Sequence, residues 1–337
     1  MTGRIAAPLV AAAMVMLLPL AGRAQDFYRS KTVTILVSTS PGGGFDANGR
    51  LLARHLGAYI AGKPQVIVQN MPGAGGGTAV RYLDNGAAKD GTVITVFNVG
   101  LIGDSLLAPQ RTKIDFRDYA WIGSIAENLA VCYLWHSVGP ENIADMRARG
   151  RLNFGSTGAG GGAAYMNIMI LKNVFGIGIH LVSGYPGSAE YDLAIERGEL
   201  DGGCDSWSSI PESWIAEGKI VPIFRAGTSQ PPDMKPGVPI LDEIAPDARA
   251  RAIVHLLNAA NELGRPFVAS RAVPAERIAI LRRAFEQAVH DPEFVAEAAK
   301  ARLPVSPRSG TQALQIVEQI YATPPDIVAA ARKVIEE

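Results

Sequence analysis

The chain has 337 residues, 48% of them hydrophobic, and its 32 lysine and arginine residues equal its 32 aspartate and glutamate residues. This length and apolar content suit two domains, each with its own core. The lack of a basic excess argues against a nucleic-acid-binding protein, and no polybasic run indicates binding to a membrane surface.

The first 24 residues have the pattern of a secretory signal peptide. Arg4 precedes an apolar run over residues 5–20, and Gly22-Arg23-Ala24 resembles a cleavage site. The run is too short to span a membrane, although a buried core helix is an alternative. We therefore expect a periplasmic protein that begins near Gln25, with no lipid anchor because no cysteine follows the run. The mature chain would carry about two more acidic than basic side chains, because Arg4 and Arg23 leave with the signal.

Strand-like and helix-like segments alternate in the first part of the mature chain. Residues 33–37, 66–68 and 92–97 are rich in β-branched residues and predict strands. Periodic apolar residues over 51–59 and the segment 78–88 predict the helices between them. This βαβαβ order implies a parallel sheet with helices on both faces.

A second alternating series follows from about residue 127. We expect strands over residues 131–135, 152–154, 177–182, 200–205 and 220–224. We expect helices over residues 141–149, 163–174 and 189–197. A proline-rich irregular segment, 230–239, then precedes two closing helices over 275–290 and 311–321. Two α/β units in one chain predict two lobes with a cleft between them.

Three glycine-rich loops follow predicted strands, over residues 41–46, 70–77 and 155–162. Glycine allows backbone N–H groups to approach a ligand, and the N-terminus of a helix favours negative charge. The loops therefore predict a site for a ligand with more than one anionic end. The ordinary alternative is a tight turn between strand and helix, with Asp46 as a cap in the first loop.

Cys132 and Cys204 are too few for a disulfide scaffold. An oxidising compartment would permit a bridge between them. We favour two unpaired thiols, because Cys132 lies in a strand-like run where a buried free cysteine is common.

An enzymatic or metal-dependent function has little support in the sequence, so we expect neither a catalytic residue nor a cofactor. No histidine pair has metal-binding helical spacing, and no Gly-x-Ser-x-Gly motif occurs. Residues 158–163 fit a Gly-x-Gly-x-x-Ala fingerprint, which makes a nucleotide-dependent oxidoreductase the rival hypothesis. The next predicted strand ends without the acidic residue that would hold a ribose.

Short motifs occur in a fixed order over most of the mature chain. They are Pro41-Gly42-Gly43-Gly44-x-Asp46, Asn70-x-Pro72-Gly73-Ala74-Gly75-Gly76, Lys89-Asp90-Gly91, Asn153-x-Gly155-Ser156-x-Gly158-x-Gly160, Tyr185-x-Gly187-Ser188-Ala189, Asp201, Asp205, Val273-Pro274-Ala275-Glu276 and Asp291-Pro292. Each motif is weak by itself, but the ordered set resembles the Bug-type extracytoplasmic solute receptors, the substrate-binding family of the tripartite tricarboxylate transporters.

The resemblance implies the type II periplasmic binding protein fold, with two lobes that close on a ligand by hinge motion. We expect lobe one to comprise residues 25–126 and 225–337, and lobe two residues 127–224. The ligands of this family are small carboxylates. The implied partner is a membrane transporter, with the ectodomain of a membrane histidine kinase as the alternative, and we expect a monomer.

The resemblance also implies which residues bind the ligand. In lobe one these are Gly42, Gly43, Gly44, Phe45, Asp46, Gly73, Ala74 and Gly75, with Asp46 holding the loop rather than touching an anion. In lobe two these are Ser156, Thr157, Gly158, Gly160, Gly187, Ser188 and Asp205. From their positions, Phe45 and Trp207 are candidates to pack against the ligand, Tyr185 to donate its hydroxyl, and Asn98 to face the cleft.

The far wall of the expected cleft departs from the family pattern. Residues 161–164 lack the usual serines and histidine, Pro186 replaces a frequent lysine, and Ser206-Trp207 replaces an amide and an aliphatic residue. The identity of the ligand is therefore not inherited. We expect its charge to be met by backbone dipoles and water, without a buried lysine or arginine.

Overall fold

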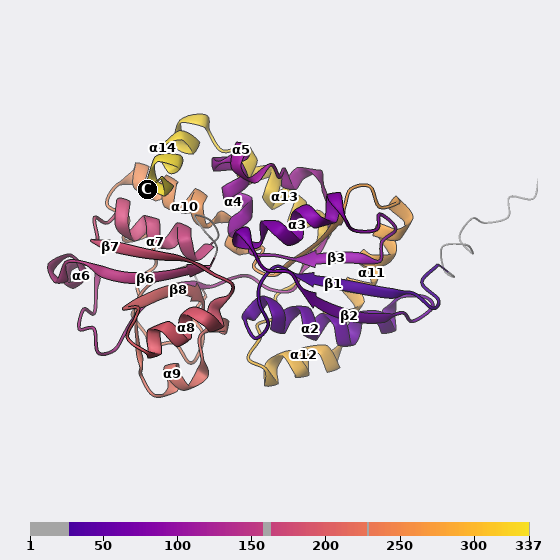
Figure 1. Cartoon of the computed structure of the whole chain (residues 1–337), viewed down its shortest axis with the longest axis horizontal. Coiled ribbons are helices and arrows are strands. Elements are labelled where there is room, and N and C mark those ends of the chain that lie inside the picture. Colours follow the sequence, from indigo (N-terminus) through magenta and orange to yellow (C-terminus); the bar gives the residue numbers. More distant parts are fainter. Residues whose placement is uncertain (1–26, 158–162, 228, 337) are drawn as a thin grey trace, which may run out of the picture.

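The computed structural model describes residues 27–157, 163–227 and 229–336, and the expected signal peptide lies outside that part of the chain. Two mixed sheets lie side by side along the long axis, and helices cover both of them (Figure 1). We call the sheet of β1 and its helices lobe one, and the sheet of β6 and its helices lobe two. The two-lobed α/β fold expected from the sequence is confirmed.

The sheet of lobe one has the strand order β11-β4-β10-β3-β1-β2. Its strands are β1 (Thr32–Val37), β2 (Gln65–Asn70), β3 (Val93–Val96), β4 (Tyr119–Ser124), β10 (Pro266–Ser270) and β11 (Arg308–Ser309). β1 pairs in parallel with β2 and β3, as the βαβαβ order predicts. β4, β10 and β11 add antiparallel pairs that the sequence pattern did not indicate, so the sheet is mixed.

Helices cover both faces of this sheet, as expected. α2 (Gly44–Leu56) and α11 (Ala275–Val289) share one buried apolar cluster with Ile35 and Phe267. α3 (Gly77–Asn85) and α13 (Gly310–Tyr321) belong to another cluster, which includes Val268. Phe267 and Val268 are neighbours in β10, so their alternation places the two clusters on opposite faces of the sheet.

The sheet of lobe two has the strand order β7-β6-β8-β5-β9. Its strands are β5 (Ala130–Trp135), β6 (Leu152–Thr157), β7 (Ile179–Tyr185), β8 (Gly202–Ser206) and β9 (Ile220–Ala226). Its helices are α6 (Ile143–Arg149), α7 (Ala163–Asn173), α8 (Ser188–Glu196) and α9 (Glu212–Ala216). β6 is parallel to β7 and β8, whereas β5 is antiparallel to β8 and β9. Apart from α9, which the sequence analysis did not predict, each of these strands and helices overlaps its predicted segment within a few residues.

The cysteine prediction is wrong. Cys132 and Cys204 face each other across β5 and β8 and form a disulfide. They are 72 residues apart in the sequence. Whether two such positions meet depends on the order of the strands in the sheet, and the local pattern of the sequence does not contain that order.

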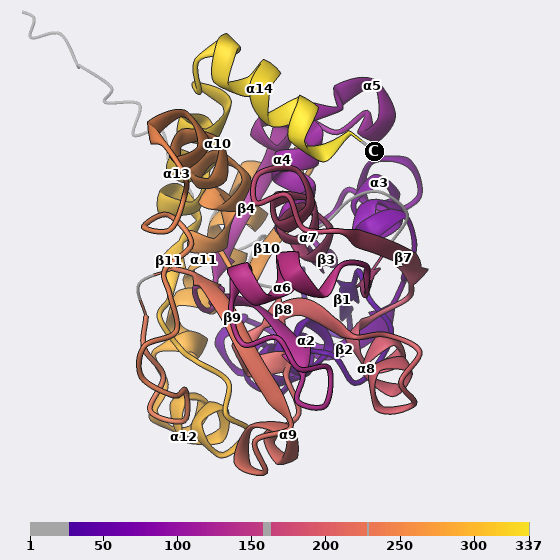
Figure 2. The same cartoon turned by 90° about the vertical axis from the view of Figure 1, so that its left-hand side faces the viewer.

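The end of the chain holds more helices than the sequence analysis expected. α10 (Ala248–Asn258), α12 (Pro292–Lys300) and α14 (Pro325–Ile335) accompany the two predicted ones. α12 carries a start signal that was available in the sequence, because Asp291 caps it and Pro292 occupies its first turn. α10 and α14 pack against α7, so the chain returns to lobe two at its end (Figure 2).

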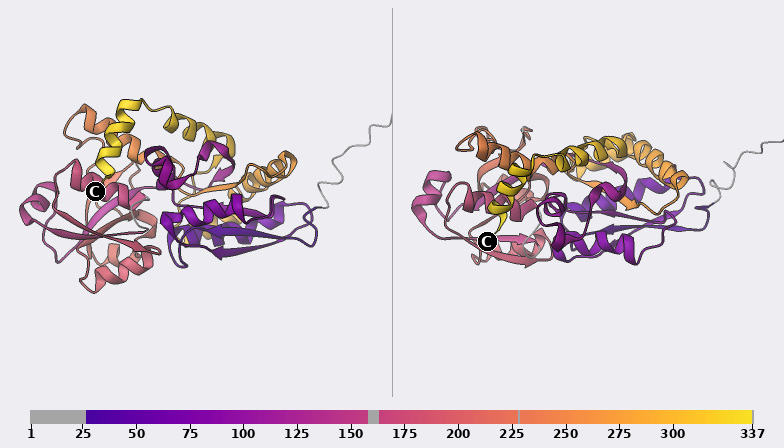
Figure 3. Two further views of the ribbon diagram at one scale, coloured as in Figure 1. Left: turned by 45° about the horizontal axis from the view of Figure 1, so that its top comes forward. Right: turned by 90° about the horizontal axis from the view of Figure 1, so that it is seen from above.

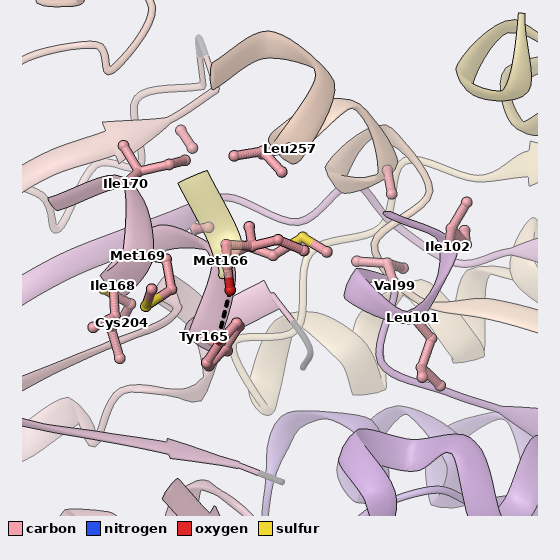
Figure 4. Close-up of a cluster of buried hydrophobic side chains, with 14 of the residues drawn as sticks. Val99, Leu101, Ile102, Tyr165, Met166, Ile168, Met169, Ile170, Cys204 and Leu257 are labelled. Carbon is pink, nitrogen blue, oxygen red and sulfur yellow. Dashed lines mark hydrogen bonds between the residues drawn. The ribbon is translucent and has the colours of Figure 1, made fainter. Parts of the chain in front are cut away.

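α13 and α14 run along one side of the molecule from lobe one towards lobe two (Figure 3). At the end of α14, the hydroxyl of Tyr165 in α7 donates to the carbonyl of Ile335 at 2.7 Å. Arg332 Nε donates to the carbonyl of Leu107, at the end of α4 (Gly100–Leu107), at 2.7 Å. Figure 4 shows the apolar side chains of α4 and α7 beside Leu257 of α10. This buried cluster therefore joins both lobes.

Two segments cross between the lobes side by side, residues 125–128 and 261–265. The N–H of Ile125 donates to the carbonyl of Arg265 at 3.2 Å, and the N–H of Arg265 donates to the carbonyl of Ala126 at 3.1 Å. The N–H of Asn128 donates to the carbonyl of Asn261 at 2.7 Å. These paired crossings are the natural place for a hinge. The division of the chain at residues 126/127 and 224/225 stays a prediction.

Candidate functional site

A pocket lies between the two lobes, at the carboxyl ends of β1, β3 and β8. Its lining is shared between Thr39, Gly44 and Asn98 of lobe one and Ser188 and Asp205 of lobe two. The cavity volume is only about 40 Å³. An adjoining pocket of about 320 Å³ shares Thr39 and Asn98 with it. An organic acid would therefore need the lobes to move apart before it could enter the inner pocket.

Three helices begin at this inner pocket. Gly43 and Gly44 start α2, Ala163 starts α7 and Ser188 starts α8, and all four residues line the pocket. The first N–H groups of a helix have no partner within it, and the helix dipole is positive at that end. Three such ends around one small cavity create a field that favours an anion.

The first glycine loop is held by Asp46. Its carboxylate accepts from the N–H of Gly42 at 3.0 Å and from Asn70 Nδ2 at 2.9 Å. Although burial alone would raise it, the pKa of Asp46 is lowered by hydrogen bonds from Arg50, Gly42 and Asn70. Asp46 thus fixes the loop, as expected. Gly43, Gly44 and Phe45 line the pocket, whereas Gly42 and Asp46 do not.

The second glycine loop lines the adjoining pocket rather than the inner one. Gly73, Ala74 and Gly75 have φ angles of 128°, 50° and 61°, a region that glycine adopts most readily. Tyr185, from the end of β7, lies on the opposite side of the same pocket. The structure therefore places this loop and Tyr185 at the adjoining pocket, beside the inner one.

Only part of the third glycine loop lies within the described residues. Ser156 lies near the end of β6 and is fully buried, and its Oγ has no hydrogen-bond partner among the described residues. Thr157 is the last residue of β6. Ser156 lines neither of the two pockets described above. Gly158 and Gly160 lie outside the described residues.

Gly187, at the start of α8, is a point of close contact between the two lobes. A Cβ atom on Gly187 would overlap the hydroxyl of Ser40 in lobe one. Ser40 Oγ donates to Glu190 Oε2 at 2.9 Å, and its N–H donates to the carbonyl of Pro186 at 3.4 Å. Glycine at this position permits the closed arrangement of the lobes.

Asn98, which follows β3, links the lobes across the pocket. Its Oδ1 accepts from the N–H of Gly100 at 3.0 Å and from the N–H of Ala163 at 3.2 Å. Gly100 starts α4 in lobe one, whereas Ala163 starts α7 in lobe two. Asn98 lines both pockets, so it faces the cleft as expected.

Asp205, at the end of β8, lies in the wall of the inner pocket among hydrogen-bond donors. It accepts from the hydroxyl of Tyr191 and from the N–H of Ser206, both at 2.7 Å. Burial raises the pKa of Asp205, and these hydrogen bonds together with Arg265 only partly offset the effect. Asp205 is therefore a poor neighbour for a second carboxylate, but it suits a hydrogen-donating group on a ligand.

Trp207 is not brought to the inner pocket. It lies in the short helical turn after β8, and its Nε1 donates to Asp233 Oδ1 at 2.8 Å. Its side chain lines a different groove, together with Pro231 and Leu303. The adjacent Ser206 lines both that groove and the inner pocket.

Sequence reasoning missed several residues of the inner pocket. Thr39 and Asn167 are 8% and 1% exposed, and Thr39 Oγ1 and Asn167 Oδ1 have no hydrogen-bond partner among the described residues. Both oxygens are therefore buried without a hydrogen bond among the described residues, which is uncommon for polar side-chain atoms. Asn167 follows Ala163 by one helical turn in α7, and this spacing was a usable signal.

The most important missed residue is Arg265, which directly precedes β10 and lines the inner pocket. It is only 3% exposed, and its guanidinium stacks on Phe45 with its carbon 4.6 Å from the ring centre. The expectation that the cleft holds no buried arginine is wrong. The sequence did not indicate the position of Arg265, because β10 is short and begins with proline and so was not predicted as a strand.

Among the described residues there is no group of acidic, cysteine and histidine side chains that could hold a metal ion. None of the described helices has the length and apolar character needed to cross a membrane.

Comparisons with known proteins agree with this architecture. No family model matches the chain. Over 248 residues the chain is 28% identical to the UPF0065 protein in the TAR-I ttuE-ttuC' intergenic region of Agrobacterium vitis, covering 72% of this chain and 69% of that protein.

Solved structures share its fold, and two of them serve as examples. The periplasmic binding protein BugD aligns with a TM-score of 0.72 and 18% identity over 90% of this chain and 97% of BugD. MatC from Rhodopseudomonas palustris, solved with bound malate, aligns with a TM-score of 0.70 and 19% identity over 90% of this chain and 99% of MatC. The resemblance indicated by the motifs agrees with these comparisons: the chain is similar in sequence to the UPF0065 protein, and it shares the two-lobed periplasmic binding protein fold of BugD and MatC.

Proposed function

We propose that the protein is a periplasmic receptor that captures a small organic acid for a transporter of the tripartite tricarboxylate type. The observation that carries this proposal is the convergence of three helix N-termini and a buried arginine on one interlobe pocket. All four features attract negative charge. The fold shared with BugD, and the malate bound by MatC, support a carboxylate as the ligand.

Binding would proceed in two steps. With the lobes apart, the carboxylate docks against the start of α2, where Gly43 and Gly44 leave the backbone accessible. Closure then brings the first turns of α7 and α8 to the other side of the ligand. A micromolar dissociation constant corresponds to about −8 kcal/mol. A few charge-assisted hydrogen bonds, at roughly 1.5–3 kcal/mol each, are sufficient to reach it after the cost of closure.

The proposal treats the protein as a receptor and not as an enzyme, and as a monomer without a cofactor. The ribose-binding acid that a nucleotide-dependent oxidoreductase requires is missing from the sequence after Val182. A closed receptor presents the same surface to a transporter or to a sensor kinase ectodomain. The genes beside this one would separate those two partners.

The function can be tested with a thermal-shift screen of the mature protein against small carboxylates, each beside its neutral amide. A ligand that binds only the folded state raises the melting temperature, with about 2.7 kcal/mol of added stability at 100 times Kd. We expect at least one acid to raise it and its amide to have no effect. A screen in which no acid is active would contradict the proposed function.

A further inference from the structure

Arg265 lies where the paired crossing segments enter lobe one, and its side chain is buried against the inner pocket. Among the described residues no carboxylate forms an ion pair with it, and Asp205 acts on it only through its charge. Burial lowers the pKa of Arg265 to about 10, so the guanidinium remains charged at neutral pH. A buried cation without a partner anion is energetically unfavourable.

The protein holds this guanidinium in place with neutral groups. Nη1 donates to Asn128 Oδ1 and to the carbonyl of Gly264, each at 3.2 Å. Nη2 donates to the hydroxyl of Ser206, from lobe two, at 2.8 Å. Phe45 covers one face of the group. The orientation of Arg265 is therefore set without neutralising its charge.

These bonds use three of the five N–H groups of the guanidinium. The two that remain are on Nε and Nη2, and two adjacent N–H groups can grip a carboxylate with parallel hydrogen bonds. The start of α2 lies beside them, because a Cβ atom on Gly44 would be 3.1 Å from Nη2. A helix N-terminus and a fork of donors thus meet at one point of the pocket.

We propose that Arg265 binds a carboxylate group of the ligand directly and is the residue that makes the receptor selective for acids over their neutral analogues. This inference rests on the proposed function and deepens it. It replaces recognition by backbone dipoles and water alone with recognition by a fixed charge. It also accounts for the burial of Arg265 beside the pocket, since the ligand supplies the missing anion.

A purely structural role is the competing explanation, because Arg265 also connects the crossing segment to lobe two through Asn128 and Ser206. The chain offers a matched control in Arg225, which is 9% exposed and lines none of the pockets described above. Arg225 donates to the backbone carbonyls of Val238, Gly227 and Ser229. It is a buried arginine that has a structural role only.

The test begins with the wild-type protein and a fixed panel of acetate, succinate, L-malate, adipate and benzoate, each with its amide. Calorimetric titration with the acid that gives the largest thermal shift is then repeated on Arg265→Gln, Arg265→Lys and Arg225→Lys. We expect Kd to rise by about 100-fold or more in Arg265→Gln, and by about tenfold in Arg265→Lys, which keeps the charge but loses the fork. Arg225→Lys should change Kd by less than about twofold, because Arg225 does not line the inner pocket.

The possible results distinguish the proposed function of the protein from the proposed role of Arg265. If no acid binds the wild-type protein, both the proposed function and the role of Arg265 are overturned. If an acid binds and Arg265→Gln binds it as tightly, only the role of Arg265 is overturned. A crystal structure of the wild-type complex provides a check that does not depend on the folding of a variant. A carboxylate within hydrogen-bond distance of Nε and Nη2 supports the proposal, and one seated beyond about 4 Å from both contradicts it.

Discussion

Asp192, in α8, has surroundings that disfavour the ionised form of its carboxyl group. Burial, followed by the nearby carboxylates of Asp205 and Glu196, raises the pKa of Asp192 from 3.8 to about 8. Between these values the folded protein keeps a proton that the unfolded chain releases. The free energy of unfolding should therefore fall as pH rises from about 4 to 8, by at most about 1.4 kcal/mol per pH unit from this group.

Asp192→Asn should remove that contribution to the pH dependence. We expect the variant to match the wild type at about pH 4 or below and to be more stable at pH 8, because asparagine stays uncharged at both values. Urea denaturation at the two pH values measures the difference. An unchanged pH dependence in the variant would show that Asp192 titrates normally.

Gly44 is a residue at which a single methyl group should decide whether the lobes can close. A Cβ atom there would overlap the hydroxyl of Ser209, from lobe two, and lie 3.1 Å from Arg265 Nη2. Gly44→Ala should therefore weaken ligand binding by about tenfold or more, as expected for overpacking, while the separate lobes stay folded. Titration calorimetry with the acid found in the screen checks this. Adding Ser209→Gly should restore much of the affinity, and a failure to do so would indicate a different cause.

At the scale of elements, the disulfide joins β5 to β8 in the middle of the second sheet. It closes a loop of 72 residues, and a cross-link of that length restricts the unfolded chain. The double change Cys132→Ala and Cys204→Ala should lower the free energy of unfolding by about 4 kcal/mol. Denaturant titration measures it, and a reducing agent should destabilise the wild type but leave the double variant unaffected. Equal stability of the two proteins would contradict a structural role for the bridge.

At the scale of the whole molecule, few polar contacts hold the lobes together at the cleft. The bond from Ser40 Oγ to Glu190 Oε2 and the bond from Ala163 N–H to Asn98 Oδ1 both cross it. Ser40→Ala should speed ligand dissociation by about fivefold, which corresponds to the loss of about one hydrogen bond. Stopped-flow displacement of the bound acid measures the rate.

Small-angle scattering of the wild type should show a smaller radius of gyration with ligand than without it, and an unchanged radius would argue against hinge closure.

Much of the fold could be predicted because its signals are local. The β-branched run of β1, the glycine loop after it and the apolar periodicity of α2 all lie within 25 consecutive residues, Thr32–Leu56. The same holds for β5 through β9, whose strands and helices, apart from the short α9, were expected in the right order. β10 escaped prediction because it is short and is buried through its pairing with β3 and β4. α10 and α14 gain their stability from packing against α7, which no local pattern reports.

The residues of the candidate site also fall into two groups, those that the sequence predicts and those that only the tertiary structure reveals. The sequence by itself determined that glycine loops follow strands, that Asp46 braces the first loop, and that the motifs resemble those of the Bug-type receptors. Only the tertiary structure decided that Arg265 enters the pocket, that Trp207 turns away from it and that Cys132 meets Cys204. The physical reason is that these outcomes depend on strand order and on the crossing between lobes. Both bring together residues that are far apart in the chain, and local periodicity and propensity carry no information about such contacts.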